Sequence, residues 1–436
     1  MQSIAVIGAG ITGVTTAYAL AKRGYKVTIF DKNRYAAMET SFANGGQLSA
    51  SNAEVWNHWS TVFKGLKWML KGNAPLLINP KPSWHKISWF LEFMAAIPQY
   101  RNNTIQTARL AIAARDHLFA WASREGIEFD ARQEGILHFY RDKGAYDHAA
   151  TVSELLAKGG LKRRPVTPEE MQAIEPTLKG DYYGGFYTPS DSSGDIHKFT
   201  QGLADAGARH GVQNLFEHQI HTVKESGDGV RISGTCRQIA FDYSFDGLVV
   251  CAGIVSRSIA ASLGDRLNVY PVKGYSITVN LLDLSSQAAA PTVSLLDDAT
   301  KLVASRLGVD RFRVAGSAEF NGANNDIRAD RIRPLLDWVH GCFPEINTRS
   351  VVPWAGLRPM MPNLMPRVGP GKSPRVFYNT GHGHLGWTLS AATAELVAGM
   401  VDQRARAVRT FVDIPVASKA KSPDMGGGRA KPDLVS

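Results

Sequence analysis

Apolar and polar positions alternate in a clear order over the first thirty residues. Residues 4–7 form a short apolar run, which is typical of a buried parallel strand. Residues 14–23 have helical periodicity, and Gly24 follows as a stop signal. A second apolar run, 25–30, ends at Asp31. The pattern predicts strand, helix and strand, the first unit of an α/β sheet.

The rest of the chain continues this mixture. Periodicity near 3.6 residues predicts helices over 104–123, 147–158, 199–212, 330–343 and 390–401. Alternating or apolar runs predict strands over 134–140, 214–251 and most of 269–320. A threonine cap and a proline-led turn open the segment 166–178. No internal repeat interrupts this order.

Residues 55–98 are rich in tryptophan. In the stretch 84–94, apolar rings are mixed with His85, Lys86 and Glu92. We favour a helix that packs into the core, with a membrane-surface patch as the alternative. Residues 418–436 are poor in apolar residues and rich in Gly, Pro and Lys, which is typical of a disordered tail.

The order of elements predicts a Rossmann-like α/β domain that is interrupted by a mainly antiparallel-sheet domain. We assign 1–75, 180–265 and 345–415 to the nucleotide domain and 76–179 and 266–344 to the substrate or cap domain, with 416–436 as the tail.

Composition and charge narrow the class of protein. The chain has 436 residues, of which 44% are hydrophobic and 20% charged, as in an ordinary globular enzyme. The net charge is +10, but the basic residues are scattered apart from 161–165, so we expect no nucleic-acid partner. Attraction to anionic lipids is compatible with this charge.

Cysteine usage and the first residues bear on the compartment. Cys236, Cys251 and Cys342 lie far apart and form no CxxC pair, so we expect a reduced, cytoplasmic setting. The start of the chain has no basic segment typical of a signal peptide, and no run of 18 uncharged apolar residues is present.

The turn after the first strand carries the motif GxGxxG, at Gly8, Gly10 and Gly13. Gly8 permits the tight turn, Gly10 lets the backbone approach a pyrophosphate, and Gly13 lets the helix pack on the strand. The helix N-terminus then faces the phosphates with free N–H groups. Asp31 can accept from a ribose hydroxyl, which disfavours NADP and leaves NAD and FAD.

Two further glycine-containing turns lie at 251–253 and 381–386. Three such turns favour a ligand larger than a nicotinamide dinucleotide, which one motif can hold. With the segments 38–49, 269–279, 354–369 and 379–390, they resemble the D-amino acid oxidase superfamily of FAD enzymes, and within it the bacterial D-amino acid dehydrogenases of the small-subunit type. The resemblance implies FAD, with the antiparallel sheet lying on the flavin face. It also implies contact of the 381–388 loop with the isoalloxazine ring.

The predicted cofactor residues follow from these motifs and from the resemblance. They are Gly8, Gly10, Ile11, Thr12, Gly13, Asp31, Lys32, Ser41, Asn44, Gly45, Gly46, Gln47, Ala252, Gly253, Gly381, His382, Gly383, Leu385, Gly386, Trp387 and Thr388. Sarcosine-oxidase-type relatives attach flavin through a cysteine in the segment that here is 355–360. That segment has none, and Cys342 is the nearest, so we expect noncovalent FAD.

Amino-acid oxidation requires a clamp for the substrate carboxylate. Arg358 is the first candidate, because a guanidinium matches a carboxylate in a dry site and because the resemblance implies an arginine here. Tyr275 could donate to the same carboxylate or form a wall of the pocket. Arg306 is a second candidate for the clamp. His382 and His384 have no third ligand at a useful spacing, so we predict no metal.

The predicted function is oxidation of a D-alanine-like D-amino acid to a 2-oxo acid and ammonia, with hydride passed to FAD. The resemblance implies a quinone or respiratory-chain acceptor, although dioxygen remains open. Possible contact with the inner face of the membrane also remains open. The alternatives are an enzyme for glycine, sarcosine or D-hydroxyproline, and a noncatalytic electron-carrying flavoprotein.

Overall fold

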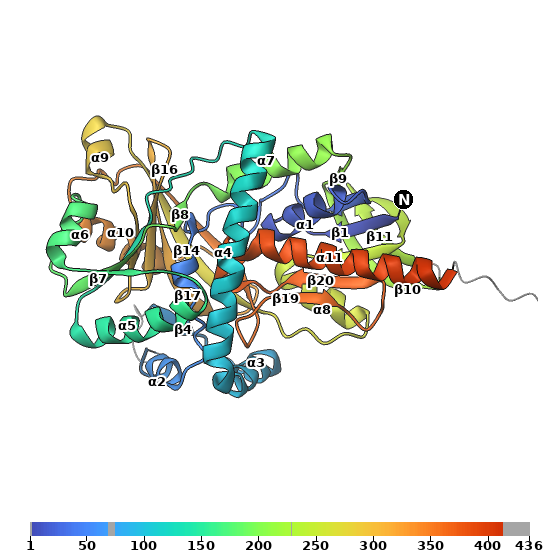
Figure 1. Cartoon of the computed structure of the whole chain (residues 1–436), viewed down its shortest axis with the longest axis horizontal. Coiled ribbons are helices and arrows are strands. Elements are labelled where there is room, and N and C mark those ends of the chain that lie inside the picture. The colour runs from blue at the N-terminus through green and yellow to red at the C-terminus, as the bar shows by residue number, and fades with distance from the viewer. Residues whose placement is uncertain (1, 69–74, 228, 413–436) are drawn as a thin grey trace, which may run out of the picture.

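A computed structural model describes residues 2–68, 75–227 and 229–412 (Figure 1). The two largest sheets occupy two lobes, and the long helix α4 (Tyr100–Glu125) crosses between them. The lobe that holds the first strand is called the nucleotide lobe below, and the other is called the sheet lobe. The predicted tail, 416–436, lies outside the described residues.

A six-stranded sheet forms the centre of the nucleotide lobe, in the order β19-β20-β13-β1-β2-β9. Its pairings are parallel except for the edge pair β19–β20. Ile4 lies between Val27 on β2 and Gly247 on β13, so segments far apart in sequence become neighbours. The strands are β1 (Ser3–Ile7), β2 (Lys26–Phe30), β9 (Gln213–Leu215), β13 (Gly247–Val250), β19 (Arg367–Pro370) and β20 (Val376–Thr380).

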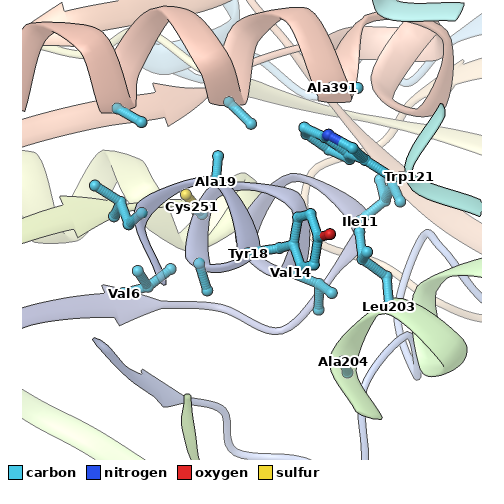
Figure 2. Packing of buried hydrophobic residues seen from close by; sticks show 14 of the residues in the cluster. Val6, Ile11, Val14, Tyr18, Ala19, Trp121, Leu203, Ala204, Cys251 and Ala391 are labelled. Atoms are coloured by element: carbon cyan, nitrogen blue, oxygen red, sulfur yellow. The ribbon is translucent and has the colours of Figure 1, made fainter. Parts of the chain in front are cut away.

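Helices cover one face of this sheet. Helix α1 (Ile11–Ala21) is buried on nearly all sides, because β1 lies beneath it and other helices lie above it (Figure 2). Tyr18 of α1 packs against Trp121 of α4, with ring centroids 5.2 Å apart. The other covering helices are α7 (Ile196–Arg209) and α11 (Gly386–Val412).

The opposite face of the sheet packs on a small antiparallel sheet, β10-β11-β12, and on α8 (Ser256–Ser262). Its strands are β10 (His218–Ser226), β11 (Gly229–Cys236) and β12 (Ile239–Phe245). Together with β9 and β13 they confirm the strands predicted over 214–251.

The sheet lobe contains nine strands in the order β18-β14-β17-β16-β15-β5-β7-β6, with β4 beside β17. Only β15–β5 and β17–β4 are parallel among these pairs, so the prediction of a mainly antiparallel sheet is confirmed. The strands are β4 (Leu76–Ile78), β5 (Ile136–Tyr140), β6 (Arg164–Val166), β7 (Gly184–Thr188), β14 (Tyr270–Asn280), β15 (Ser294–Asp297), β16 (Leu302–Leu307), β17 (Arg311–Phe320) and β18 (Val351–Met360).

Helix α10 (Ala329–Cys342) packs on one face of the nine-stranded sheet, and the other face is turned toward the nucleotide lobe. Helix α6 (Pro168–Ile174) has the predicted threonine cap, which forms a capping box with Glu170. The remaining helices are α2 (Trp59–Trp68), α3 (Trp84–Ala95), α5 (Lys143–Lys158) and α9 (Leu284–Ala289). A short ladder joins β3 (Gln47–Leu48) to β8 (Ser192–Ser193).

The lobes divide the chain differently from the predicted boundaries at three elements. Strands β7 and β18 were assigned to the nucleotide domain, but β7 pairs with β5 and β18 pairs with β14 in the sheet lobe. Helix α4 was assigned to the cap, yet its Leu118 and Trp121 are buried in the core of the nucleotide lobe. Apolar side chains at helical spacing did not indicate which lobe α4 would cover.

The tryptophan-rich segment contains both of the faces that we considered. Trp89 and Phe93 of α3 are buried in a cluster with Phe320, as expected for core packing. Trp84 of α3 and Phe63 of α2 are instead exposed, at 76% and 66%. No helix within the described residues has the length and apolar character needed to cross a membrane.

Candidate functional site

A cavity of about 1390 Å³ lies between the lobes. It begins at the turn after β1 and extends to the inner face of the nine-stranded sheet, where β14, β17 and β18 line it. All the predicted cofactor residues line this cavity except Gly13 and Gly46. Of the three predicted catalytic residues, Arg358 and Tyr275 line it and Arg306 does not.

The first glycine turn has the geometry that its motif requires. Gly8 has φ +105°, and a Cβ there would lie 2.6 Å from the carbonyl oxygen of Cys251. A Cβ on Gly13 would lie 1.8 Å from the Gly8 carbonyl oxygen, so Gly13 serves helix–strand packing rather than the cavity. Beside Gly10, the nearest atom to a Cβ would be Ser41 Oγ at 3.5 Å. Gly10 therefore presents open backbone to the cavity.

Polar groups surround this turn. Asp31, at the end of β2, accepts from the backbone N–H groups of Ala9 at 2.7 Å and Asn33 at 2.8 Å. Burial raises the pKa of its carboxyl group. Ser41 Oγ accepts from the Ile11 N–H at 3.0 Å, at the start of α1. Lys32 lies at the cavity and pairs with Glu39 at 2.9 Å.

The segment 44–47 is pressed against the sheet lobe. A Cβ on Gly45 would lie 2.4 Å from Val303 Cγ2, and Gly46 adopts φ +72° close to Leu307. Gln47 Nε2 donates to Ser294 Oγ and to the carbonyl oxygen of Leu295, both at 2.9 Å. These contacts fix the segment 44–47 at the boundary between the two lobes.

The loop 381–388 brings a group of unsatisfied polar atoms to the same cavity. The buried atoms without a hydrogen-bond partner within the described residues include Gln47 Oε1, His382 Nδ1, His384 Nε2 and Trp387 Nε1. Each belongs to a residue that lines the cavity. Buried polar atoms normally have partners, so the atoms of Gln47, His382 and Trp387, which include a donor and an acceptor, fit a bound heterocycle with both kinds of edge atom.

Arg358 lies on β18 at the sheet-lobe end of the cavity. Its NH1 donates to the carbonyl oxygen of Ser317 at 2.6 Å, and its NH2 donates to that of Gly316 at 3.3 Å. Ser317 has φ +60° and lies at the irregular register of β17 beside β14, so a local distortion supplies these two carbonyl groups. No carboxylate of the described residues pairs with Arg358. Burial lowers the pKa of its guanidinium to about 10, so it stays charged at neutral pH.

Gly274 creates the space for this guanidinium. A Cβ at Gly274 would lie 2.4 Å from Arg358 Cζ and 2.5 Å from NH1. Neighbouring strand residues point to opposite faces, so Tyr275 turns away from Arg358 toward α10. Its hydroxyl donates to Glu319 at 2.9 Å. Tyr275 still lines the cavity, as expected for a wall of the pocket, and its role as a carboxylate donor stays a prediction.

Arg306 is also placed away from the site. Its NH1 and NH2 donate to the carbonyl oxygens of Ala290 at 3.3 Å and Val309 at 2.9 Å, which fixes a turn of the sheet lobe. Arg306 does not line the cavity, and its role as a second clamp stays a prediction. Its neighbours in sequence gave no sign of these carbonyl partners.

The two histidines of the loop have separate environments. His382 is buried and bonds Thr393 Oγ1 through Nε2 at 2.9 Å, whereas His384 stacks on Trp56 with ring centroids 4.6 Å apart. Burial lowers the pKa of His382 to about 3 and that of His384 to about 4. The described residues contain no group of three or more His, Cys, Asp or Glu side chains that could hold a metal ion.

Comparison with known proteins identifies the family. Residues 3–400 match the family described as FAD dependent oxidoreductase. The chain belongs to this family. It is 62% identical to "D-amino acid dehydrogenase 3" of Mesorhizobium japonicum over 403 residues, which cover 92% of this chain and 97% of that relative. It is 40% identical to a D-amino acid dehydrogenase of Paramagnetospirillum magneticum, with 93% and 96% covered.

Solved structures support the same fold. Glycine oxidase from Geobacillus kaustophilus superposes with a TM-score of 0.68 at 20% identity, covering 92% of this chain and 95% of that one. L-proline dehydrogenase from P. horikoshii superposes with a TM-score of 0.71 at 16% identity, covering 92% and 93%. These likenesses confirm the predicted fold, and the family match over residues 3–400 confirms FAD as the cofactor.

The sequence interpretation missed three features of the site. These are the space left by Gly274, the carbonyl groups around Ser317, and the pairing of Trp56 with His384. Gly274 could have been found, since a glycine within a strand often marks a close approach by another group. The other two depend on contacts between distant segments and have no local signal.

Proposed function

We propose that this protein oxidises D-amino acids with small side chains, such as D-alanine, to the 2-oxo acid and ammonia. One observation carries the proposal: Arg358 is a charged guanidinium at the FAD cavity, and its hydrogen-bond partners among the described residues are two carbonyl groups. A half-buried cation without a counter-ion is costly, and a substrate carboxylate would supply one. The D configuration comes from the names of the relatives.

Separate groups of residues would bind the substrate and the cofactor. Arg358 holds the carboxylate by charge-assisted hydrogen bonds and so fixes the α-carbon. FAD, when bound, accepts the hydride from that carbon. The glycine turn after β1 and Asp31 would hold the dinucleotide, and the loop 381–388 would donate backbone N–H groups to the edge of the ring where negative charge develops. Release of ammonia then follows hydrolysis of the imino acid in water.

The test is anaerobic mixing of the holoenzyme with single substrates while the flavin absorbance is followed. D-alanine should bleach the flavin band, and L-alanine should not. Glycine, sarcosine and D-hydroxyproline form the comparison set, because enzymes for these substrates differ in pocket shape. If only one of these three compounds bleaches the flavin band, that compound and not D-alanine is the substrate. A flavin that no amino acid reduces would support a noncatalytic carrier instead.

We further propose a quinone as the electron acceptor, on the resemblance to dehydrogenases rather than oxidases. Aerobic turnover of D-alanine should be slow without an acceptor and fast with a soluble quinone. Stoichiometric peroxide at an undiminished rate without quinone would assign dioxygen as the acceptor.

A peripheral contact with the membrane is supported by the exposed apolar side chains of α2 and α3. Trp59, Phe63, Trp84, Ile87 and Leu91 are each more than 40% exposed. Together with the net charge of +10, they favour an anionic lipid surface. The holoenzyme should float with phosphatidylserine vesicles, and Phe63→Glu combined with Trp84→Glu should abolish flotation without loss of FAD. Unchanged flotation of this variant would contradict the contact.

A further inference from the structure

His384 and Arg358 line the same cavity. Met360 of β18 and His382 form an isolated antiparallel bridge. The bridge joins β18, which carries Arg358, to the loop in which His384 follows two residues later. Burial is the main cause of the low pKa of His384, and the charge of Arg358 lowers it further, so the two side chains are close enough to interact electrostatically. Arg358 and His384 therefore belong to one end of the cavity.

The imidazole of His384 is held in place and yet lacks one partner. Trp56 stacks on it with an interplanar angle of 18°. The backbone of Asn52 forms a hydrogen bond with the ring, which raises the pKa. Nε2 is buried and has no hydrogen-bond partner within the described residues. A ring fixed in this way, with a lone pair at Nε2, is suited to accept a hydrogen bond from something that enters the cavity.

The substrate carries a donor in the matching position. An α-amino acid at neutral pH has an ammonium group one carbon away from its carboxylate, and hydride can leave the α-carbon only when the nitrogen has a free electron pair. We propose that His384 is the group that accepts the proton of the substrate ammonium while Arg358 holds the carboxylate. This proposal rests on the proposed function.

The proton transfer is balanced. One N–H bond of the ammonium breaks, its electron pair stays on the amine nitrogen, and a new N–H bond forms at Nε2 of His384. The products of this step are a neutral amine and an imidazolium ion, so total charge is conserved. No oxidant is needed until hydride leaves the α-carbon for FAD.

The charges around His384 favour the step once substrate is bound. Of the two causes of the low pKa of His384, burial is the larger and the charge of Arg358 is the smaller. The substrate carboxylate neutralises this charge, which makes the imidazole a stronger base at the moment when the ammonium arrives. Two other titratable groups that line the cavity already have partners. Glu54 contacts Tyr100 at 2.7 Å and His148 at 3.4 Å, and His382 forms a hydrogen bond with Thr393.

The test uses the FAD-loaded His384→Phe variant, which keeps an aromatic ring against Trp56 but has no lone pair. Two measurements are compared with wild type. One is the Kd of propanoate, which has the carboxylate and lacks the amine, measured from its effect on the flavin spectrum. The other is the rate of anaerobic flavin reduction by D-alanine from pH 7 to pH 10.

The proposal expects a propanoate Kd within threefold of wild type and a fall of about 100-fold in reduction at pH 7, the usual contribution of a general base. The deficit should shrink as pH rises toward the pKa of the free amine, because the substrate then arrives deprotonated. His384→Asn should behave alike, which guards against poor folding of the phenylalanine variant.

Three results would overturn the proposal. They are wild-type reduction at pH 7, a deficit that does not change with pH, or a loss of propanoate affinity as large as the loss of reduction rate. A wild-type enzyme that D-alanine fails to reduce would refute the proposed function instead, so the two failures are distinguishable.

Discussion

The space beside Gly274 gives the sharpest test of the carboxylate clamp. Gly274→Ala would place a Cβ 2.4 Å from Arg358 Cζ, whereas ordinary contacts begin at 3.4 Å. The guanidinium must therefore move by about 1 Å, and its bonds to the carbonyl oxygens of Ser317 and Gly316 must lengthen or break. A displacement of this size at a positioning group costs about 100-fold in rate, or about 2.7 kcal/mol.

The assay is kcat/KM for D-alanine together with FAD content per protein. We expect a loss of about 100-fold with normal FAD content, because Gly274 touches the clamp and not the nucleotide turn. Gly341→Ala is the matched control, since a Cβ on Gly341 of α10 would meet no atom within 4 Å. Near-normal kcat/KM in Gly274→Ala, or an equal loss in Gly341→Ala, would refute the geometry proposed for the clamp.

Four further outcomes are expected. Arg358→Ala should lower kcat/KM by about 3–5 kcal/mol, and Arg358→Lys should recover only part, since a lysine lacks the planar fork; steady-state kinetics with D-alanine tests both. Gly386→Val should reduce FAD occupancy with little effect on the thermal stability of the apoprotein, because the nearest atom to a Cβ is His382 Cβ at 3.8 Å. Gly383→Val should lower both FAD occupancy and thermal stability, because Gly383 has φ +59° and its Cβ would lie 2.6 Å from Met360 Sδ. Acid precipitation should release all flavin into the supernatant, and colour retained in the pellet would contradict noncovalent attachment. The folded-state pKa values of His382 and His384, about 3 and about 4, lie below the usual 6.5, so the unfolded state binds more protons than the folded state. The free energy of unfolding of the apoprotein should therefore fall as pH falls from 6.5 toward 4, by about 2 kcal/mol per histidine at pH 5. Urea unfolding at a series of pH values measures this.

The sequence predicted the nucleotide half of the site better than the substrate half. The turn from Gly8 to Gly13 is local: strand, turn and helix are consecutive, so spacing alone placed Gly8 and Gly10 at the cavity. Helix α1 begins at Ile11, three residues before the predicted start, because the turn enters the helix directly.

The substrate half depends on pairing between distant strands. Tyr275 and Gly274 are neighbours in sequence, but which of the two faces the cavity is set by the packing of β14 between β17, β18 and α10. Arg306 and Arg358 both follow small or apolar residues, and only the fold decides that the first bonds Val309 while the second reaches the cavity. Periodicity gives the faces of a strand without saying what covers each one.

The position of β1 between β2 and β13, with α11 over α1, has a consequence for synthesis. The nucleotide turn is made well before its sheet partners at 247–250 and 376–380 and before the loop 381–388. The apolar faces of β1 and α1 therefore stay uncovered in the nascent chain until these later segments have been translated. FAD loading is then a late event in biogenesis, and a chain interrupted before α11 would be a substrate for chaperones and proteases rather than an apoenzyme ready for cofactor.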